Sequence, residues 1–389
     1  MRLNEQFVIC AVLLIAAMGT GVVKALAEEK TGAAPGKAHG LMNLRKPDKP
    51  RFPVTDIVWP AHPGEADICL WEDDKLAAFS YGADDNCAPN VPWWLEQTKI
   101  YNIHMTWFLV TENVNVNAMA GSWKLWQQAL EAGHGIESHT VKHWVGFKGD
   151  SPPEGWKGMD WEYSESIKQI EAGLPGHEVR CLAYAGGAPQ KRNDPNLAAK
   201  YYLAARGGYP SPNAANNIDY MNVQASGGPY TRPVGENPKI DFSNFNHVLI
   251  PHDLTYRGWV FGFSHWVGNP DQKKGVLVTF DWYKEHAEQL WCGLFCDVAR
   301  YGQERDTAKL VVDENNGSRI AFTLTDQMDD RFYDYPLTIK VRLPGNSKGV
   351  KAVQQTKEVP VRIVEKDGGK FALVKAVPDR GQVVMTPTR

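Results

Sequence analysis

The sequence lacks the features that mark several classes of protein. Its one long apolar run, Phe7–Met18, is too short for a confident membrane span. Neither sign of charge is in excess, because 42 lysines and arginines face 45 aspartates and glutamates, a formal net charge of −3. That balance argues against nucleic acid or an anionic membrane as the partner. The chain also shows no internal repeat.

Cysteine is scarce, and its distribution does not indicate a disulfide framework. Once the N-terminal segment with Cys10 is removed, five cysteines remain, and an odd number in an exported protein leaves at least one thiol unpaired. Cys292 and Cys296 share one face of a predicted helix, a spacing that suits a zinc pair. No second Cys or His pair lies near them in the sequence, so we interpret them as buried thiols.

The N-terminus has the layout of a secretory signal. Arg2 precedes the apolar run, and Ala25-Leu26-Ala27 follows it, which predicts cleavage after Ala27. We therefore expect a secreted or periplasmic protein with no membrane span after cleavage. An uncleaved anchor is the alternative, because Lys24 lies close to the cut.

Four regions are predicted along the chain: a signal peptide (1–27), a flexible leader rich in Gly, Pro, Ala and Lys (28–60), an α/β domain (61–309) and a small all-β module (310–389). In the second half of the α/β domain we predict a strand over Gly275–Phe280 and one long amphipathic helix over Trp282–Arg305. Alternating strands and helices of this length indicate a parallel barrel or open parallel sheet.

The hydrophobic pattern differs in the last 80 or so residues, where apolar and polar residues alternate in short runs separated by turn residues. Strands are predicted at Ile320–Leu324, Leu337–Leu343, Val359–Val364, Phe371–Val377 and Val383–Met385. We interpret the module as sandwich-like. It contains no histidine, and we find no catalytic set in it.

Ionisable side chains gather where predicted strands end. Asp84 and Asp85 follow the strand Leu76–Tyr81, and His139 and His143 stand four residues apart after a later strand. One carboxylate and two imidazoles suit a hydrolytic Zn²⁺-type centre, and the other carboxylate is then free to act as a base. By itself the histidine pair is a weak signal. Because parallel strands present their carboxyl ends together, we expect these groups to meet.

The ordered set resembles a known family. Phe79-Ser80-x-x-x-Asp84-Asp85, then His139-Thr140-x-x-His143, then Leu182-Ala183-Tyr184 and finally His265 resemble the motifs of the NodB-like polysaccharide deacetylases, carbohydrate esterase family four. The resemblance covers roughly residues 65 to 305. It implies a distorted (β/α) barrel and a metal-dependent hydrolase that removes N-acetyl or O-acetyl groups from a carbohydrate polymer.

The resemblance also implies roles for particular residues. Asp85, His139 and His143 would hold a divalent metal, most simply Zn²⁺, with Co²⁺, Mn²⁺ or Ni²⁺ as alternatives. Asp84 would be the base that activates the attacking water, and His265 the acid that protonates the leaving group. The substrate side would be completed by an oxyanion contact from the backbone near Tyr184, by Arg206 and by Trp266.

Two departures from the family pattern concern the first and third motifs. Asn86 follows the aspartate pair where the family has glycine, which leaves the geometry of that loop open. The family's arginine is missing from the third motif, and Arg206, at the end of the next strand, is the candidate to replace its charge. The alternative is an ordinary surface arginine.

Two other functions stay open at this point. The fourteen tryptophans suit a surface that stacks on sugar rings, although core packing accounts for most of them. A catalytically silent carbohydrate-binding protein on the same fold would fit the altered motifs. A metal-dependent hydrolase acting on a different C–N or C–O bond is the third reading, because fold does not fix the substrate. The sequence does not disclose the polymer, the metal ion or the oligomeric state.

Overall fold

The computed structural model describes residues 40–146, 150–187, 193–208, 210–226 and 241–388. The predicted signal peptide and the first part of the predicted leader lie outside these ranges. Within the described part of the chain, no helix combines the length and apolar character needed to cross a membrane.

A seven-stranded parallel sheet forms the centre of the α/β region. Its strands are β2 (Ala77–Ala83), β3 (Thr106–Leu109), β4 (Gly135–Ser138), β5 (Cys181–Ala183), β6 (Ala204–Arg206), β7 (Trp259–Ser264) and β8 (Leu290–Cys292). The order along the sheet is β6-β5-β4-β3-β2-β7, and β8 also pairs with β2. This parallel arrangement with covering helices confirms the predicted NodB-like α/β fold class.

The barrel is distorted at two places. β8 pairs with the first half of β2, whereas β3 pairs with the last two residues of β2. The strands β3 and β8 therefore lie one after the other along the same edge of β2. No strand of the described chain joins β6 to β7. Instead, an irregular segment spans them through isolated bridges that link Val223 to Arg206, Asn213 to Trp259 and Ser226 to Gly262.

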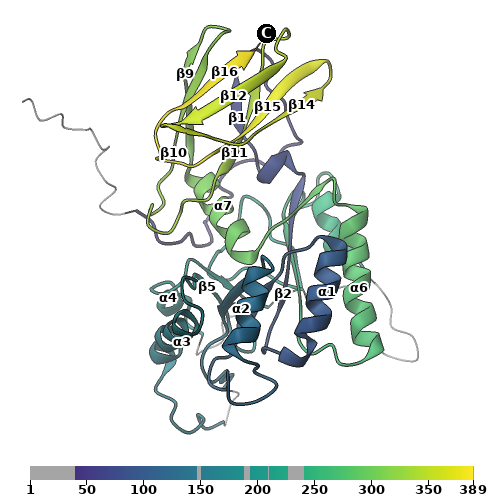
Figure 1. Cartoon of the computed structure of the whole chain (residues 1–389), viewed down its shortest axis with the longest axis vertical. Coiled ribbons are helices and arrows are strands. Elements are labelled where there is room, and N and C mark those ends of the chain that lie inside the picture. Colours follow the sequence, from purple (N-terminus) through teal and green to yellow (C-terminus); the bar gives the residue numbers. More distant parts are fainter. Residues whose placement is uncertain (1–39, 147–149, 188–192, 209, 227–240, 389) are drawn as a thin grey trace, which may run out of the picture. The chain divides into compact units, whose positions relative to one another are not determined.

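Helices cover both faces of the sheet. The outer face carries α1 (Val91–Tyr101), α2 (Trp123–Glu131), α3 (Met159–Gly173), α4 (Pro195–Ala198), α5 (Ser243–Asn246) and α6 (Pro270–Glu285) (Figure 1). α7 (Phe295–Thr307) packs on the opposite face, where Phe295 contacts Phe108 of β3. Local signals start two of these helices. Pro92 lies in the first turn of α1, and the Ser122 hydroxyl accepts from the Leu125 amide at the start of α2.

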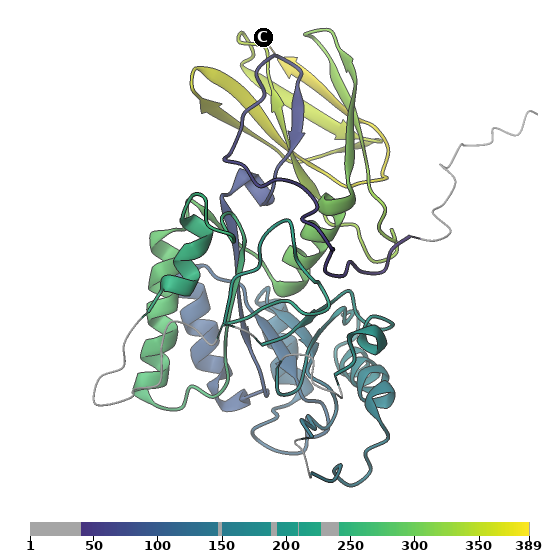
Figure 2. The ribbon, with the colours of Figure 1, turned by 180° about the vertical axis from the view of Figure 1, so that it is seen from behind.

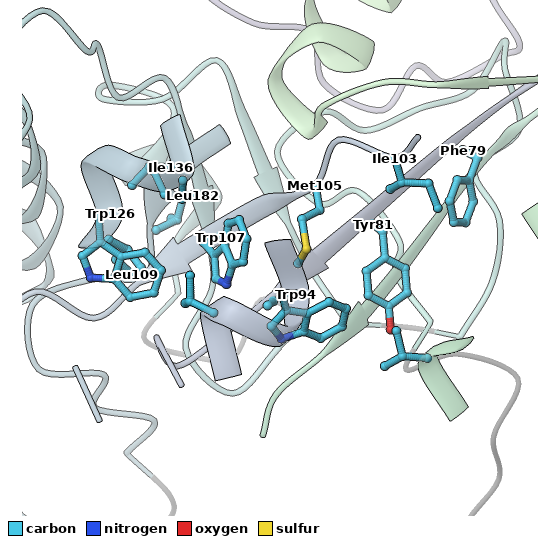
Figure 3. Close-up of a cluster of buried hydrophobic side chains, with 14 of the residues drawn as sticks. Phe79, Tyr81, Trp94, Ile103, Met105, Trp107, Leu109, Trp126, Ile136 and Leu182 are labelled. Carbon is cyan, nitrogen blue, oxygen red and sulfur yellow. The ribbon is translucent and has the colours of Figure 1, made fainter. Parts of the chain in front are cut away.

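A large aromatic core lies between this sheet and its helices (Figure 3). Phe79 and Tyr81 project from alternate positions of β2. Tyr81 packs against Trp94 of α1 and Phe280 of α6, and Phe79 stacks on Tyr283 of α6. Trp107 of β3 packs against Trp126 of α2 in the same way. Six of the fourteen tryptophans are buried, and three more, Trp93, Trp123 and Trp291, pack against the buried clusters, so most of them contribute to the core as the sequence suggested.

Two predictions of secondary structure are wrong. Gly275–Phe280 is the middle of α6 and not a strand, because the Asn269 capping box and Pro270 start a helix that outweighs the local run of β-branched residues. The single helix predicted over Trp282–Arg305 is interrupted. α6 ends at Glu285, β8 joins the sheet, and α7 begins only at Phe295.

The C-terminal residues form two antiparallel sheets. One has the order β1-β11-β15-β14 and the other β13-β12-β16-β10-β9. The strands are β1 (Ala66–Ile68), β9 (Lys309–Asn315), β10 (Ile320–Thr325), β11 (Leu337–Arg342), β12 (Gly349–Gln354), β13 (Lys357–Glu358), β14 (Val361–Lys366), β15 (Gly369–Ala376) and β16 (Val383–Thr388). The strands β9, β12 and β13 were not predicted from the sequence.

β1 belongs to this module by its pairing, although the sequence analysis assigned its residues to the barrel. Each of its residues pairs with β11, from Ala66 opposite Val341 to Ile68 opposite Ile339. Figure 2 shows the purple N-terminal segment running beside the yellow-green strands. A buried ion pair of 2.9 Å between Asp74 and Lys340 adds a second connection from the chain before β2 to β11.

Candidate metal centre

The backbone at the end of β2 adopts a conformation that few residue types tolerate. Asp85, Asn86 and Cys87 have φ values of 59°, 61° and 47°, three left-handed residues in succession. Asparagine tolerates this region better than most residues, which explains how Asn86 can stand where glycine is usual. Its side chain also accepts from the Val110 amide and donates to the Val110 and Ala120 carbonyls, so it fixes the loop to the end of β3.

The second loop, after β4, carries both histidines. Its turn is closed by the Thr140 hydroxyl, which accepts from the His143 amide at 3.1 Å. Glu162 of α3 supports the same turn, because one of its carboxylate oxygens accepts from the amides of Val141 at 2.7 Å and Lys142 at 2.9 Å. Burial raises the pKa of the Glu162 carboxyl, and these two hydrogen bonds oppose that effect.

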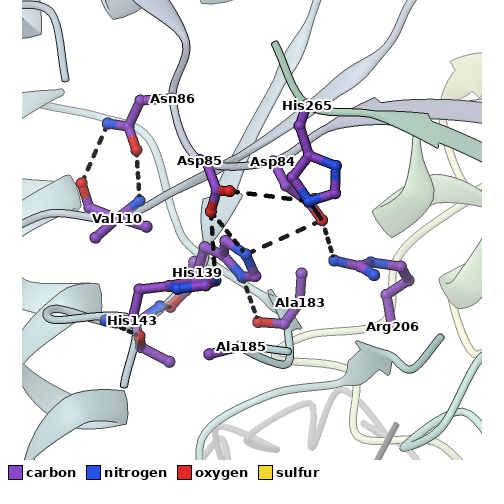
Figure 4. A network of polar contacts seen from close by, with 12 residues as sticks. Asp84, Asp85, Asn86, Val110, His139, His143, Ala183, Ala185, Arg206 and His265 are labelled. Atoms are coloured by element: carbon purple, nitrogen blue, oxygen red, sulfur yellow. Dashed lines mark hydrogen bonds and ion pairs between the residues drawn. The ribbon is translucent and has the colours of Figure 1, made fainter. Parts of the chain in front are cut away.

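Asp85, His139 and His143 converge (Figure 4). One carboxylate oxygen and two ring nitrogens lie within 4.8 Å of one another. Asp85 Oδ1 is 3.5 Å from His139 Nε2 and 3.3 Å from His143 Nε2. The same oxygen is buried and has no hydrogen-bond partner among the described residues. An unpartnered carboxylate oxygen facing two imidazole nitrogens fits a divalent cation with N and O ligands.

The protonation of these groups suits the same use. His139 Nδ1 donates to the Ala183 carbonyl at 2.8 Å, which leaves the lone pair on Nε2 facing Asp85. Burial, followed by the neighbouring His139, lowers the pKa of His143 to about 4, so its imidazole is neutral at pH 7. Burial would raise the pKa of Asp85, but the surrounding imidazoles, His139 foremost, hold it well below its usual range.

Asp84 lies beside this group and has a different partner. Its Oδ2 accepts from Arg206 at 2.5 Å, and both side chains are 2% exposed. The guanidinium also donates to the Gly207 carbonyl and lies over the Phe263 ring at 4.5 Å. Arg206 is therefore not an ordinary surface arginine. Asp84 Oδ1 is buried without a hydrogen-bond partner in the described part of the chain, so one oxygen is held and the other is free.

His265 and Trp266 border the site on the β7 side. His265 follows the last residue of β7, and its Nε2 lies 3.7 Å from Asp84 Oδ2 and 3.8 Å from Asp85 Oδ2. Its side chain is 54% exposed, in contrast to the buried His139. Trp266 is the one tryptophan among the strongly exposed apolar side chains of the described residues. It is therefore accessible to a large ligand.

Tyr184 does not supply the predicted oxyanion contact. Its amide donates to the Arg206 carbonyl at 3.1 Å, as part of the β5–β6 pairing. Its side chain is fully buried, and the hydroxyl donates to the Met221 carbonyl. Because the β5–β6 ladder already uses its N–H, Tyr184 itself is not the donor, and a backbone donor near it stays a prediction. The sequence motif marks the strand end but does not reveal which amide is free.

Three further contributors escaped the sequence analysis. Glu162 stands about twenty residues beyond the histidine pair on a separate helix, and the Ala183 carbonyl carries no side-chain signal at all. Asn86 was noticed only as a departure from the family pattern. Only its positive φ and its three backbone contacts explain why the amide is suited to that position.

Comparison with known proteins identifies the family of one region. Residues 74–202 match the family model for polysaccharide deacetylase. This region is therefore a polysaccharide deacetylase domain, of the NodB-like family that the motifs resemble. The match contains both aspartates and both histidines of the site, and it ends before Arg206 and His265.

Three similar proteins show how far the likeness extends. A gellan lyase from a Bacillus species is 32% identical over 354 residues, which is 85% of this chain but 14% of that protein, so the chain spans a small part of this relative. The Xyl-CE4 domain of a multidomain xylanase from the hindgut metagenome of Trinervitermes trinervoides is 15% identical, covering 56% of this chain and 87% of that chain with a TM-score of 0.33. A CE4 family pseudoenzyme from Bacillus anthracis is 12% identical, covering 58% and 66%, with a TM-score of 0.35.

Proposed function

We propose that the chain is an exported, metal-dependent hydrolase that removes acetyl groups from a carbohydrate polymer. The observation that carries the proposal is the division of labour between two adjacent aspartates. Asp85 Oδ1 faces two imidazole nitrogens, whereas Asp84 is held by a buried guanidinium and keeps one oxygen free. One acid is thus suited to a cation and the other to a proton.

Asp85, His139 and His143 would hold the divalent ion. When bound, such an ion polarises the acetyl carbonyl and lowers the pKa of a coordinated water. Asp84 would take the proton of the attacking water on Oδ1, while Arg206 keeps the carboxylate in place through Oδ2. His265, on the β7 side and open to solvent, would protonate the departing sugar nitrogen or oxygen.

The substrate class rests on the family and on the surroundings of the site. Trp266 is adjacent to His265 and presents an accessible indole, which suits stacking on a pyranose ring. The relative named gellan lyase makes gellan a polymer worth testing beside chitin-type, peptidoglycan and acetylated xylan substrates. Export, with cleavage after Ala27, would bring the enzyme to such polymers. N-terminal sequencing of protein released from an exporting host tests that part.

The decisive experiment combines metal analysis with acetate release. The purified protein should hold about one divalent ion and release acetate from at least one of these polymers. Asp84→Asn should keep the ion yet lose at least about a hundredfold in rate, since a positioned base contributes that much. Asp73→Asn is the matched control, because Asp73 pairs with Lys375 outside the site. Metal bound with no acetate released from any polymer would instead favour a silent carbohydrate-binding protein.

A further inference from the structure

A second group of ionisable side chains lies on the sheet below the metal centre. Glu137 of β4, Cys181 of β5 and Cys296 of α7 bring one carboxylate oxygen and two sulfur atoms within 4.8 Å of one another. Glu137 and Cys181 are buried, and Cys296 is half-buried. The mechanism above uses none of the three.

The two sulfur atoms lie within 4.8 Å of each other, and this distinguishes these cysteines from the other described ones. Cys181 and Cys296 share a side-chain hydrogen bond. By contrast, the Cys69 thiol is hydrogen-bonded to Asp74, and Cys292 Sγ points to the His104 carbonyl at 3.9 Å. One pair of cysteines thus already lies close in space, although 114 or so residues separate its members in the chain.

We propose that Cys181 and Cys296 form a disulfide bond in the mature protein. The geometry that carries the proposal is the approach of two sulfur atoms to within 4.8 Å of each other, one on β5 and the other on α7, where both are free thiols in this structure. Exported proteins meet oxidising surroundings, in which such a pair becomes a disulfide. The proposal draws on the export suggested above for that environment, but its test does not depend on export.

The chemistry needs a disulfide oxidant such as oxidised glutathione. The Cys296 thiolate attacks one glutathione sulfur, forms a mixed disulfide and expels one glutathione thiolate. Cys181 then gives up its proton, and its sulfur attacks Cys296 Sγ and expels the second glutathione thiolate. Two electrons pass from the cysteines to glutathione, and the two protons end on the glutathione thiolates.

The electrostatics select Cys296 as the attacking thiol. The hydrogen bond from Cys181 lowers the pKa of Cys296, burial opposes this, and the Arg300 guanidinium adds to the lowering. Burial raises the pKa of Cys181 well above its usual range. Cys181 therefore acts second, as the resolving thiol.

The bond would brace the strand that orients a metal ligand. Cys181 is the first residue of β5, and the Ala183 carbonyl at the other end of β5 accepts from His139 Nδ1. Glu137 holds the same strand start, because its carboxylate accepts from the amides of Arg180 and Cys181. A covalent link to α7 would fix the position of β5 relative to that helix.

The test maps cysteines in the full chain produced in an oxidising host compartment and purified without reductant. The protein is alkylated in denaturant, with and without prior reduction, and its peptides are analysed by mass spectrometry. Without reduction, Cys181 and Cys296 should escape alkylation and appear as one linked peptide pair, while Cys69, Cys87 and Cys292 are alkylated. Alkylation of both Cys181 and Cys296 in the unreduced protein would overturn the proposal.

Variants and metal analysis separate the remaining explanations. Reduction should lower the Tm of the wild type and of the control Cys292→Ser by about 5 °C or more, and should leave the Tm of Cys296→Ser unchanged. A second bound zinc per chain, lost in Cys296→Ser and accompanied by two free thiols, would overturn the disulfide in favour of a metal site. Acetate release is measured separately, so failure of the deacetylase proposal and failure of this one are distinguishable.

Discussion

Removing the charge of Arg206 is the sharpest test of how the site is built. Arg206→Met keeps an unbranched side chain but leaves the Asp84 carboxylate buried without its counter-charge. The pair is 2.5 Å apart and both members are 2% exposed, so water does not replace the lost contact. Breaking a buried pair of this kind costs about 3–5 kcal/mol of unfolding free energy.

The double variant Asp84→Asn/Arg206→Met distinguishes a broken pair from a general loss of packing. Because it buries neither charge, it should be more stable than Arg206→Met by about 2 kcal/mol or more. Urea unfolding in EDTA measures the unfolding free energies of the metal-free wild type, the two single variants and the double variant. Arg362→Met serves as the control, since Arg362 is half exposed and lies 4.0 Å from Asp73, and it should change stability by less than about 0.5 kcal/mol.

The same variant should affect catalysis in a characteristic way. Without the guanidinium, Asp84 Oδ2 loses the hydrogen bond from Arg206, so the carboxylate is no longer held in one orientation and kcat should fall about tenfold or more. Acetate release from a polymer at saturating substrate measures kcat. Additive free-energy changes in the two single variants and the double variant, together with an unchanged kcat, would refute the view that Arg206 holds Asp84 in its working state.

Three further predictions concern neighbours of the site and the core. Glu162→Gln weakens the hydrogen bonds from the Val141 and Lys142 amides that hold the histidine loop, so zinc affinity should fall about tenfold while kcat at saturating zinc changes little. An unchanged affinity in a zinc titration would exclude this role. Trp266→Ala removes the exposed indole, so KM for a polymer should rise about threefold to tenfold while kcat is preserved. Activity on a small acetylated sugar should not change. Equal effects on both substrates would contradict stacking. Burial, followed by His104, lowers the pKa of His134 to about 4. The unfolded chain therefore binds the extra proton first as pH falls from 6.5, so the folded protein loses stability between pH 6.5 and 4. In EDTA, His134→Gln should reduce that loss by roughly 1–2 kcal/mol, and identical pH dependence in the variant would show that this ring contributes nothing.

The strands and turns that position the site were largely predictable, because their signals are local. Gly135–Ser138 is a strand, Ser122 caps α2 and Pro92 lies in the first turn of α1, and each of these features follows from residues within a few positions of it. The errors arose where a local preference competed with a stronger signal or with tertiary pairing. The three residues of β8 form a strand because β2 offers them an edge, and no pattern within Leu290–Cys292 reveals that.

Some residues of the site were likewise predictable from the sequence, and others were not. Asp84, Asp85, His139 and His143 stand at strand ends in recognisable spacings, and the parallel sheet brings them together. The role of a supporting group such as Glu162 depends on how α3 lies against the histidine loop. Such a contact has no periodicity and no motif, so only the folded arrangement identifies it.

The pairing of β1 with β11 has a practical consequence for dissecting the protein. The short strand lies ahead of the barrel in the chain, yet it completes a sheet whose other members come after it. The barrel is thus topologically an insertion within the sandwich, and no single cleavage point frees one from the other intact. A fragment that starts beyond Ile68 would strip β11 of a neighbour and uncover its backbone, inviting edge-to-edge association.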